Sequence, residues 1–191
     1  MEFFVVAALF AQPAHALRPP GTPPPVQVGP ANGPSECAGV EFKEDKFTHQ
    51  LTSNVRASTS PNYVGGLLLK AQFSAAFDGG RVEMTIQVPS NGVRSEVFAA
   101  GYKVMLLLQD ESVVELTTTE AVNPAVQTLG NVHTLWAVRL PLDRSQVTQL
   151  AAQPLSAMRT PLPGGDLTWL VGKGDAKAFG RAFTCFATLL P

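Results

Sequence analysis

Few residues in this chain could do chemistry, and the densest group lies in the stretch FKEDKFTH, residues 42–49. Lys43, Glu44, Asp45 and His49 bring an ammonium group, two carboxylates and an imidazole into one short segment. On a single loop these side chains could form the rim of a ligand site or hold a cation. The simpler interpretation, which we favour, is a solvated polar turn whose opposite charges form weak surface pairs.

The histidines and cysteines show no pattern typical of a metal site or a catalytic nucleophile. Outside residues 1–16 the chain has only His49 and His133, which lie on different predicted elements, and it has no closely spaced thiols to supply zinc ligands. It also lacks the G-x-S-x-G elbow of serine hydrolases, a phosphate-binding P-loop and a calcium-binding EF-hand loop. The sequence therefore predicts no metal, no cofactor and no nameable catalytic residue.

Two arrangements stay open because they would arise only on folding. Carboxylates that are distant in sequence can meet across a cleft, as glycoside hydrolysis requires. The aromatic residues could line a groove for a sugar or a peptide, but on apolar strand faces they belong more often to the core. The residues concerned are Trp136, Trp169, Tyr63 and Tyr102.

The two cysteines, Cys37 and Cys185, flank the whole predicted domain. In an oxidising compartment such a pair forms a disulfide that ties the start of the domain to its last element. The alternative is one buried and one free thiol. We predict the disulfide, and this prediction depends on export of the protein.

The N-terminus has the features of an export signal. An apolar run over residues 3–10 is followed by the small-residue motif Ala14-His15-Ala16, and the run is too short to span a bilayer. The segment before the run departs from the usual pattern because it carries Glu2 and no basic residue. We expect residues 1–16 to be a signal peptide and the mature protein to be periplasmic or extracellular.

Residues 17–36 are rich in proline and glycine, which excludes a helix or a central strand. A spacer is the expected structure, and a ligand for proline-recognising modules is the less favoured alternative. The composition after this segment predicts no electrostatic partner, because charged residues make up only 15% of the chain and the formal net charge is -1. No basic stripe typical of nucleic-acid binding is visible, so we expect none.

Two β-hairpins are predicted from alternating apolar and polar residues. Residues 67–77 and 82–88 alternate around Asp78-Gly79-Gly80, so that one face of the hairpin is apolar and the other polar. A second hairpin over residues 101–120 is expected to turn at Asp110-Glu111. That turn places Met105 and Leu107 on the same face as Val114 and Leu116. Because both faces of the hairpin are then apolar, we expect other elements to pack against each of them.

The last third of the domain mixes strands and helices. Strands are expected over residues 131–140, 155–160 and 166–173. Between them, Asp143 and Gln146 form a capping-box pattern before a short apolar stripe that Pro154 ends. Phe179, Phe183 and Phe186 are at helical spacing near the C-terminus, although a terminal strand is the alternative there.

Together these patterns predict a mainly β (α+β) domain over residues 37–191, an antiparallel sheet or sandwich of about six to eight strands with one or two short covering helices. A half-open barrel with a helix is the alternative. We expect an exported, non-enzymatic domain that acts in binding, inhibition or structure in the cell envelope or extracellular space, with a protein, peptide or glycan as its partner. The alternative function is a hydrolase that acts on an envelope polymer through carboxylates assembled by the fold.

Overall fold

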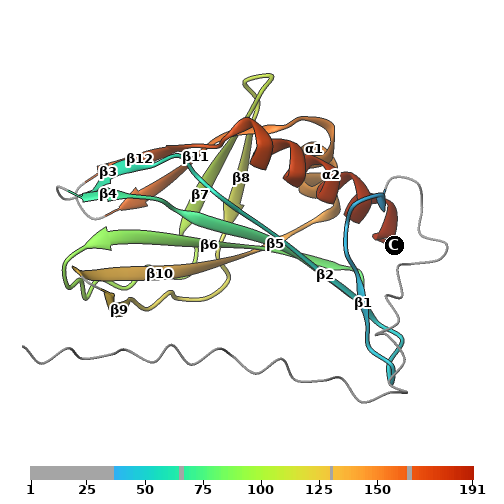
Figure 1. The fold of residues 1–191 in the computed structure, drawn as a ribbon, viewed down its shortest axis with the longest axis horizontal. Helices are drawn as coiled ribbons and strands as arrows, with labels where there is room; N and C mark the ends of the chain where they lie inside the picture. Colours follow the sequence, from blue (N-terminus) through green and yellow to red (C-terminus); the bar gives the residue numbers. More distant parts are fainter. Residues whose placement is uncertain (1–36, 65–66, 130, 163–164) are drawn as a thin grey trace, which may run out of the picture.

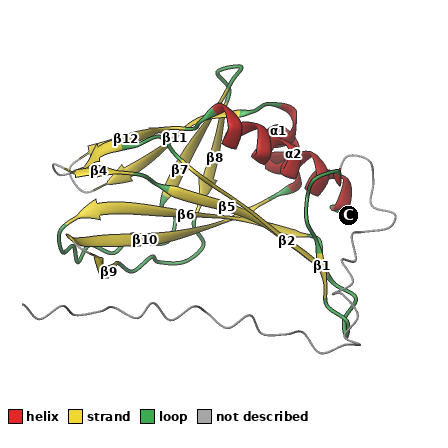
Figure 2. Ribbon diagram, in the orientation of Figure 1, coloured by secondary structure: helices red, strands yellow, loops and turns green. Residues whose placement is uncertain are grey.

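The computed structural model describes residues 37–64, 67–129, 131–162 and 165–191. The predicted signal peptide and spacer lie outside the described residues. Antiparallel strands dominate the described part, with two helices near the C-terminus (Figures 1 and 2), and this confirms the predicted β-rich α+β class. None of the helices described is long and apolar enough to cross a membrane.

Two antiparallel sheets form the body of the domain. The six-stranded sheet has the order β1 (Lys43–Glu44), β2 (Leu51–Ser58), β5 (Gln72–Asp78), β6 (Arg81–Asn91), β10 (Asn131–Leu142) and β9 (Ala125–Leu129). The four-stranded sheet has the order β12 (Gly165–Leu170), β11 (Leu155–Leu162), β7 (Lys103–Leu108) and β8 (Val113–Thr117). A separate small hairpin consists of β3 (Asn62–Val64) and β4 (Leu67–Leu69).

The helices α1 (Arg144–Ala152) and α2 (Lys173–Leu189) pack against each other at one end of the two sheets (Figure 1). Helix α2 contacts β2 and β5 of one sheet and β11 of the other, and α1 also contacts β8. The core therefore lies between the sheets and beneath α2. Its largest fully buried side chains include Trp136, Trp169, Phe179, Phe183 and Phe186.

The first predicted hairpin is confirmed in β5 and β6. Asp78 pairs with Arg81, so the turn is the two-residue loop Gly79-Gly80, and both glycines have the positive φ that a type I′ turn requires. The strand expected over residues 67–77 is interrupted, however, between β4 and β5. The N–H and C=O groups of Ala71 in this break bond to Thr59 rather than to a neighbouring strand.

The face assignment of the second predicted hairpin was wrong by one residue. Leu106 pairs with Val114 and Leu107 with Val113, and Leu108 N–H bonds to the carbonyl oxygen of Ser112. The loop thus has three residues rather than two, because Glu111 adopts a positive φ of 67°. A one-residue slip exchanges the two faces of a strand, so Leu106 is in the core while Leu107 and Val113 are exposed.

Both predicted helices are present. Asp143 and Gln146 form the capping box of α1 through reciprocal side-chain and backbone bonds, and the helix ends two residues before Pro154. Helix α2 buries Phe179, Phe183 and Phe186, which excludes the alternative of a terminal strand.

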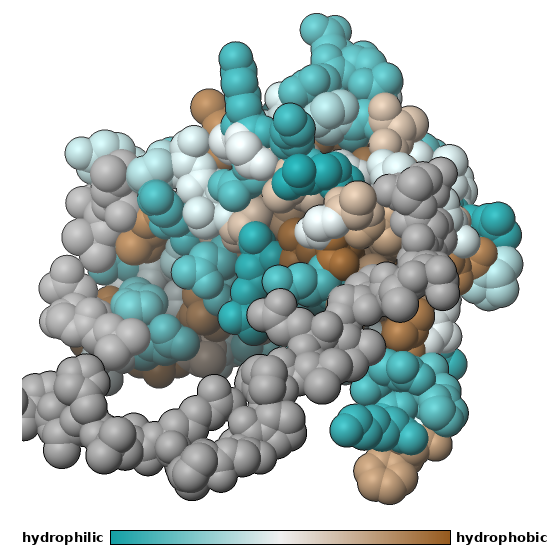
Figure 3. All heavy atoms as spheres, turned by 45° about the vertical axis from the view of Figure 1, so that its right-hand side comes forward, coloured by the Kyte–Doolittle hydropathy of each residue, from teal (hydrophilic) through white to brown (hydrophobic). Residues whose placement is uncertain are grey.

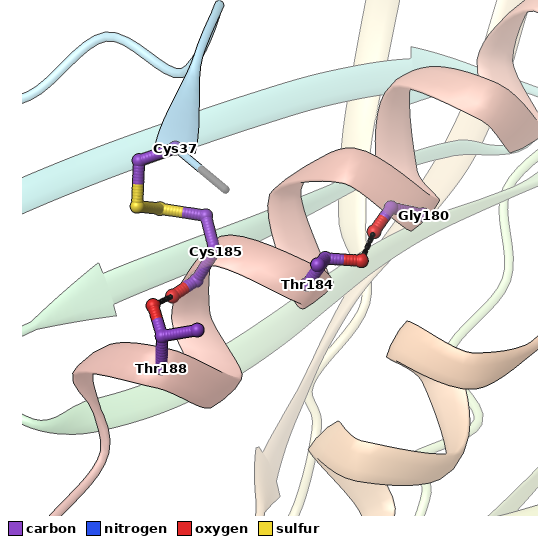
Figure 4. Close-up of a disulfide and its surroundings, with 5 residues drawn as sticks. All are labelled: Cys37, Gly180, Thr184, Cys185 and Thr188. Carbon is purple, nitrogen blue, oxygen red and sulfur yellow. Dashed lines mark hydrogen bonds between the residues drawn. A yellow bond between two sulfur atoms is a disulfide. The ribbon is translucent and has the colours of Figure 1, made fainter. Parts of the chain in front are cut away.

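The predicted disulfide between Cys37 and Cys185 is confirmed (Figure 4). It joins the beginning of the described chain to α2, 148 residues later, and both cysteines are buried. The close-up also shows side-chain bonds within α2, where the Thr188 and Thr184 hydroxyls donate to the carbonyl oxygens of Cys185 and Gly180.

Candidate functional site

The residues predicted as a ligand rim lie together at the tip of the β1–β2 hairpin, which projects at the lower right of Figure 3 and is mostly hydrophilic, with the exposed Phe47 in its turn. Lys43 and Glu44 form β1, and His49 follows in the turn. His49 Nδ1 lies 2.8 Å from Glu44 Oε1, and both side chains are exposed. A ligand at this tip stays a prediction.

The structure shows what Asp45 does in this turn. Its Oδ1 accepts hydrogen bonds from the backbone N–H groups of Phe47 and Thr48, at 2.8 and 3.0 Å. These two bonds hold the pKa of Asp45 below its ordinary value. One oxygen of this carboxylate is therefore occupied in shaping the turn. Across the described ranges, no three His, Cys, Asp or Glu side chains gather closely enough to hold a metal ion.

An open groove lies between α1 and α2. Its volume is about 480 Å³, which lies within the range typical of small-ligand sites. We call it the helix groove, and its lining residues are Gln109, Ala151, Ala152, Pro154, Lys173, Ala176, Lys177, Gly180, Arg181 and Thr184.

Small residues create the helix groove. Ala151 and Ala152 of α1 face Ala176 and Gly180 of α2, so no large side chain fills the space between the helices. A Cβ atom added at Gly180 would meet nothing within 4 Å. The Thr184 hydroxyl closes one side of the groove through bonds to the carbonyl oxygens of Gly180 and Ala151, at 2.9 and 3.5 Å.

The charge of the helix groove is entirely positive. Lys173, Lys177 and Arg181 line it at a spacing of four residues, which places them on one face of α2. All three are exposed, and no carboxylate lines the groove with them. The salt bridges formed among the described residues join other pairs, namely His49–Glu44, Arg94–Glu96 and Lys103–Glu115.

Two carboxylates lie close in sequence to residues of the groove. Asp175 is on α2 between Lys173 and Lys177, but it does not line the groove. Asp110 adjoins Gln109 of the groove, but its Oδ1 accepts bonds from the N–H and hydroxyl groups of Ser112 within its own turn. These bonds lower the pKa of Asp110. The cations of the groove therefore have no acidic side chain of the described chain within salt-bridge distance, and an anionic ligand could pair with all three.

Sequence reasoning missed this stripe of three cations. The spacing of Lys173, Lys177 and Arg181 is visible in the sequence, but their charges are balanced over the whole chain by acidic residues that lie elsewhere. A helical plot of residues 173–189 would have revealed the stripe opposite the buried phenylalanines.

A second hollow has a volume of about 270 Å³ and lies against the outer face of β6 and β10. Glu83 and Glu120 line it together with Arg139, so two carboxylates that are distant in sequence border one concavity. The aromatic residues considered for a sugar groove do not lie on one surface. Trp136 and Trp169 are buried in the core, whereas Tyr63 is exposed.

Comparison of the chain with protein-family models, with curated proteins and with solved structures gives no match in any of the three.

Proposed function

We propose that this protein is an exported, non-enzymatic binding domain of the cell envelope or extracellular space, and that it binds an anionic ligand in the helix groove. The observation that carries the proposal is the combination of Lys173, Lys177 and Arg181 with a groove that no carboxylate lines. Unpaired charges at a concave surface attract a ligand of opposite charge. The amino-terminal end of α2 adds its helix dipole at the Lys173 end of the groove.

The spacing of the cations favours an extended acidic peptide as the ligand. Residues four apart on a helix are separated by about 6 Å along its axis. Alternate residues of an extended peptide repeat at about 6.7 Å and point to the same side. Acidic residues at alternate positions of a peptide would therefore face Lys173, Lys177 and Arg181 in turn, while the alanine and glycine surface accepts the peptide backbone.

The binding experiment uses a short fluorescent peptide in which glutamate alternates with serine. We expect it to bind the wild-type protein with an affinity that falls as salt is added. In the double variant Lys177→Glu/Arg181→Glu we expect the affinity to fall at least tenfold, or about 1.4 kcal/mol, because two attractions become repulsions.

The matched control reverses two charges outside the groove, in Lys46→Glu/Lys70→Glu, and should bind as the wild type does. A peptide with glutamine in place of glutamate should not bind. Equal loss of affinity in the two double variants would contradict the groove as the site. Preference for an oligosaccharide of uronic acids over the peptide would keep the groove and change the ligand class.

Export rests on the signal pattern in residues 1–16 and on the disulfide, which forms in oxidising compartments. Intact mass of the protein recovered outside the cytoplasm, measured after alkylation without reduction, should correspond to loss of residues 1–16 and to no alkylated thiol. A retained N-terminus with two alkylated cysteines would contradict export.

The hydrolase is the second candidate function, and the hollow that Glu83 and Glu120 share with Arg139 favours it. Paired carboxylates can serve as general acid and as base or nucleophile. If the protein hydrolyses an envelope polysaccharide, Glu83→Gln and Glu120→Gln should each lower the rate at least a hundredfold. Unchanged rates in both variants, or no activity in the wild type, would exclude this hollow as an active site.

A further inference from the structure

The exposed edges of the two sheets are almost all protected against pairing with another chain. An unprotected edge strand offers free N–H and C=O groups on which a further strand can be added. The edge strand β1 has only two residues, Lys43 and Glu44, both charged. The edge strand β12 is covered by the segment before β3, where Ser60 N–H donates to the carbonyl oxygen of Leu170 at 2.8 Å.

The edge strand β8 is protected by α1 and by charge. The Gln146 side-chain amide donates to the carbonyl oxygen of Glu115 at 3.0 Å. The Glu115 carboxylate also forms a salt bridge of 2.8 Å with Lys103 on the neighbouring strand. These are the usual means by which natural sheets block their edges.

Strand β9 differs from the other three edges. It ends the six-stranded sheet and pairs only with β10 among the described residues (Figure 1). Its sequence, AVQTL, has no charged residue and no proline, and its register with β10 is continuous from Ala125 to Leu129. Within the strand there is therefore neither a charge nor a proline to discourage strand addition, and Pro124 directly precedes it.

Two exposed valines lie at this edge, one on β9 and one on β10. Val126 lies opposite Thr134, on the same face as Val132, and these valines are 51% and 40% exposed. The segment after β6 crosses this face, because Gly92 N–H donates to the carbonyl oxygen of Val132 and Arg94 N–H to the hydroxyl of Thr134. Val93 and Val97 of that segment are exposed as well. Val126 and Val132 thus offer apolar surface beside the free edge of the sheet.

We propose that a second copy of this chain pairs with β9 in antiparallel orientation, with Gln127 on the two-fold axis. In this register Val126 of one copy lies opposite Thr128 of the other, a favourable pair of β-branched residues. Gln127 faces its own copy, and a side-chain amide both donates and accepts hydrogen bonds. The two six-stranded sheets then form one continuous sheet across the dimer.

The charge of the molecule favours a second copy over a charged partner. The formal net charge of the chain is -1, so two copies repel each other only weakly. The strand itself carries no charge that a basic or acidic partner could recognise. An isologous interface requires only that the edge be complementary to itself, and AVQTL places no like charges opposite each other when paired about its central residue.

Sedimentation analysis of the protein, purified as the producing cell processes it, tests the dimer. We expect a concentration-dependent dimer for the wild type. Gln127→Lys and Gln127→Glu should each raise the dimer dissociation constant at least tenfold, because like charges then face each other across the axis. An equimolar mixture of these two variants should restore the dimer, since opposite charges then meet.

The matched control is Gln72→Lys, which places the same charge on the same face of the sheet but on β5, away from the edge. It should dimerise as the wild type does. Oxidation of Gln127→Cys should give a covalent dimer, and Gln72→Cys should not. A wild-type monomer at the highest attainable concentration, or a dimer that Gln127→Lys and Gln127→Glu both leave unchanged, would overturn the proposal.

Discussion

Tyr102 shows how one residue links the two sheets. Its hydroxyl donates a hydrogen bond to the carbonyl oxygen of Pro161 on β11. Its ring stacks on Phe98 at 4.4 Å between centroids, and Phe98 stacks in turn on Trp136 of β10 at 4.9 Å. Two of the four aromatic residues considered in the sequence as a possible sugar platform, Tyr102 and Trp136, thus form with Phe98 a column that connects the sheets.

The pKa of Tyr102 predicts how the stability of the protein changes at alkaline pH. Burial of the hydroxyl, assisted by the negative charge of Asp166, raises the pKa above its ordinary value of 10.0. In the unfolded chain Tyr102 loses its proton near that ordinary value, whereas the folded protein retains it. Deprotonation therefore stabilises the unfolded state relative to the folded state as pH rises above about 10, and the stability contributed by Tyr102 at lower pH is lost.

The chain has two tyrosines, so Tyr63→Phe leaves Tyr102 as the only phenol that can titrate. The tyrosinate absorbance of this variant should appear only as the protein unfolds at alkaline pH. An absorbance change near pH 10 with the fold intact would contradict burial of the Tyr102 hydroxyl.

Among the elements, helix α2 has two functions that place different demands on its sequence. One face buries Phe179, Phe183 and Phe186, and the opposite face forms the wall of the helix groove. Gly180 lies in the interior of the helix, where glycine is less favourable than alanine by about 1 kcal/mol. A glycine at this position keeps the groove open at a cost in stability.

We expect Gly180→Ala to raise the free energy of unfolding by about 0.5–1 kcal/mol in urea denaturation, because the new methyl group meets nothing within 4 Å. Gly79→Ala is the opposing control and should destabilise the protein. Gly79 has a positive φ of 53°, and an added Cβ would lie 2.1 Å from Gln50 Nε2. A destabilised Gly180→Ala variant would mean that the groove is narrower than described.

Among the helices and strands, the features that depend on neighbouring residues could be predicted from the sequence. Local signals placed the β5–β6 turn within Asp78-Gly79-Gly80 and specified the capping box of α1, since each depends on residues close together in the chain. The β7–β8 register was missed because it depends on the left-handed backbone of Glu111, a residue type that rarely adopts this conformation. The helix groove could not be predicted, because it arises only where α1 and α2 pack.

For the whole molecule, the disulfide is the main constraint on the unfolded chain. Cys37 and Cys185 close a long loop, and Cys185 lies on the helix that contacts both sheets. The pairing was predictable because two cysteines allow only one connectivity.

Replacement of both cysteines by serine should lower the free energy of unfolding by about 2–5 kcal/mol. Reductant should destabilise the wild type by a similar amount and have no effect on the double variant. Urea midpoints that coincide for the oxidised wild type and the double variant would contradict a stabilising disulfide.

The central claim is that the helix groove binds an anionic ligand, and nuclear magnetic resonance tests it most directly. In a titration of the isotope-labelled protein with the alternating glutamate–serine peptide, we predict that the amide signals of Lys173, Lys177, Arg181 and the facing Ala151 and Ala152 shift in proportion to binding. The β1–β2 hairpin and the β9 edge should not change. Shifts confined to the hairpin tip at residues 43–50, or no shifts in α1 and α2 at saturating peptide, would contradict the claim.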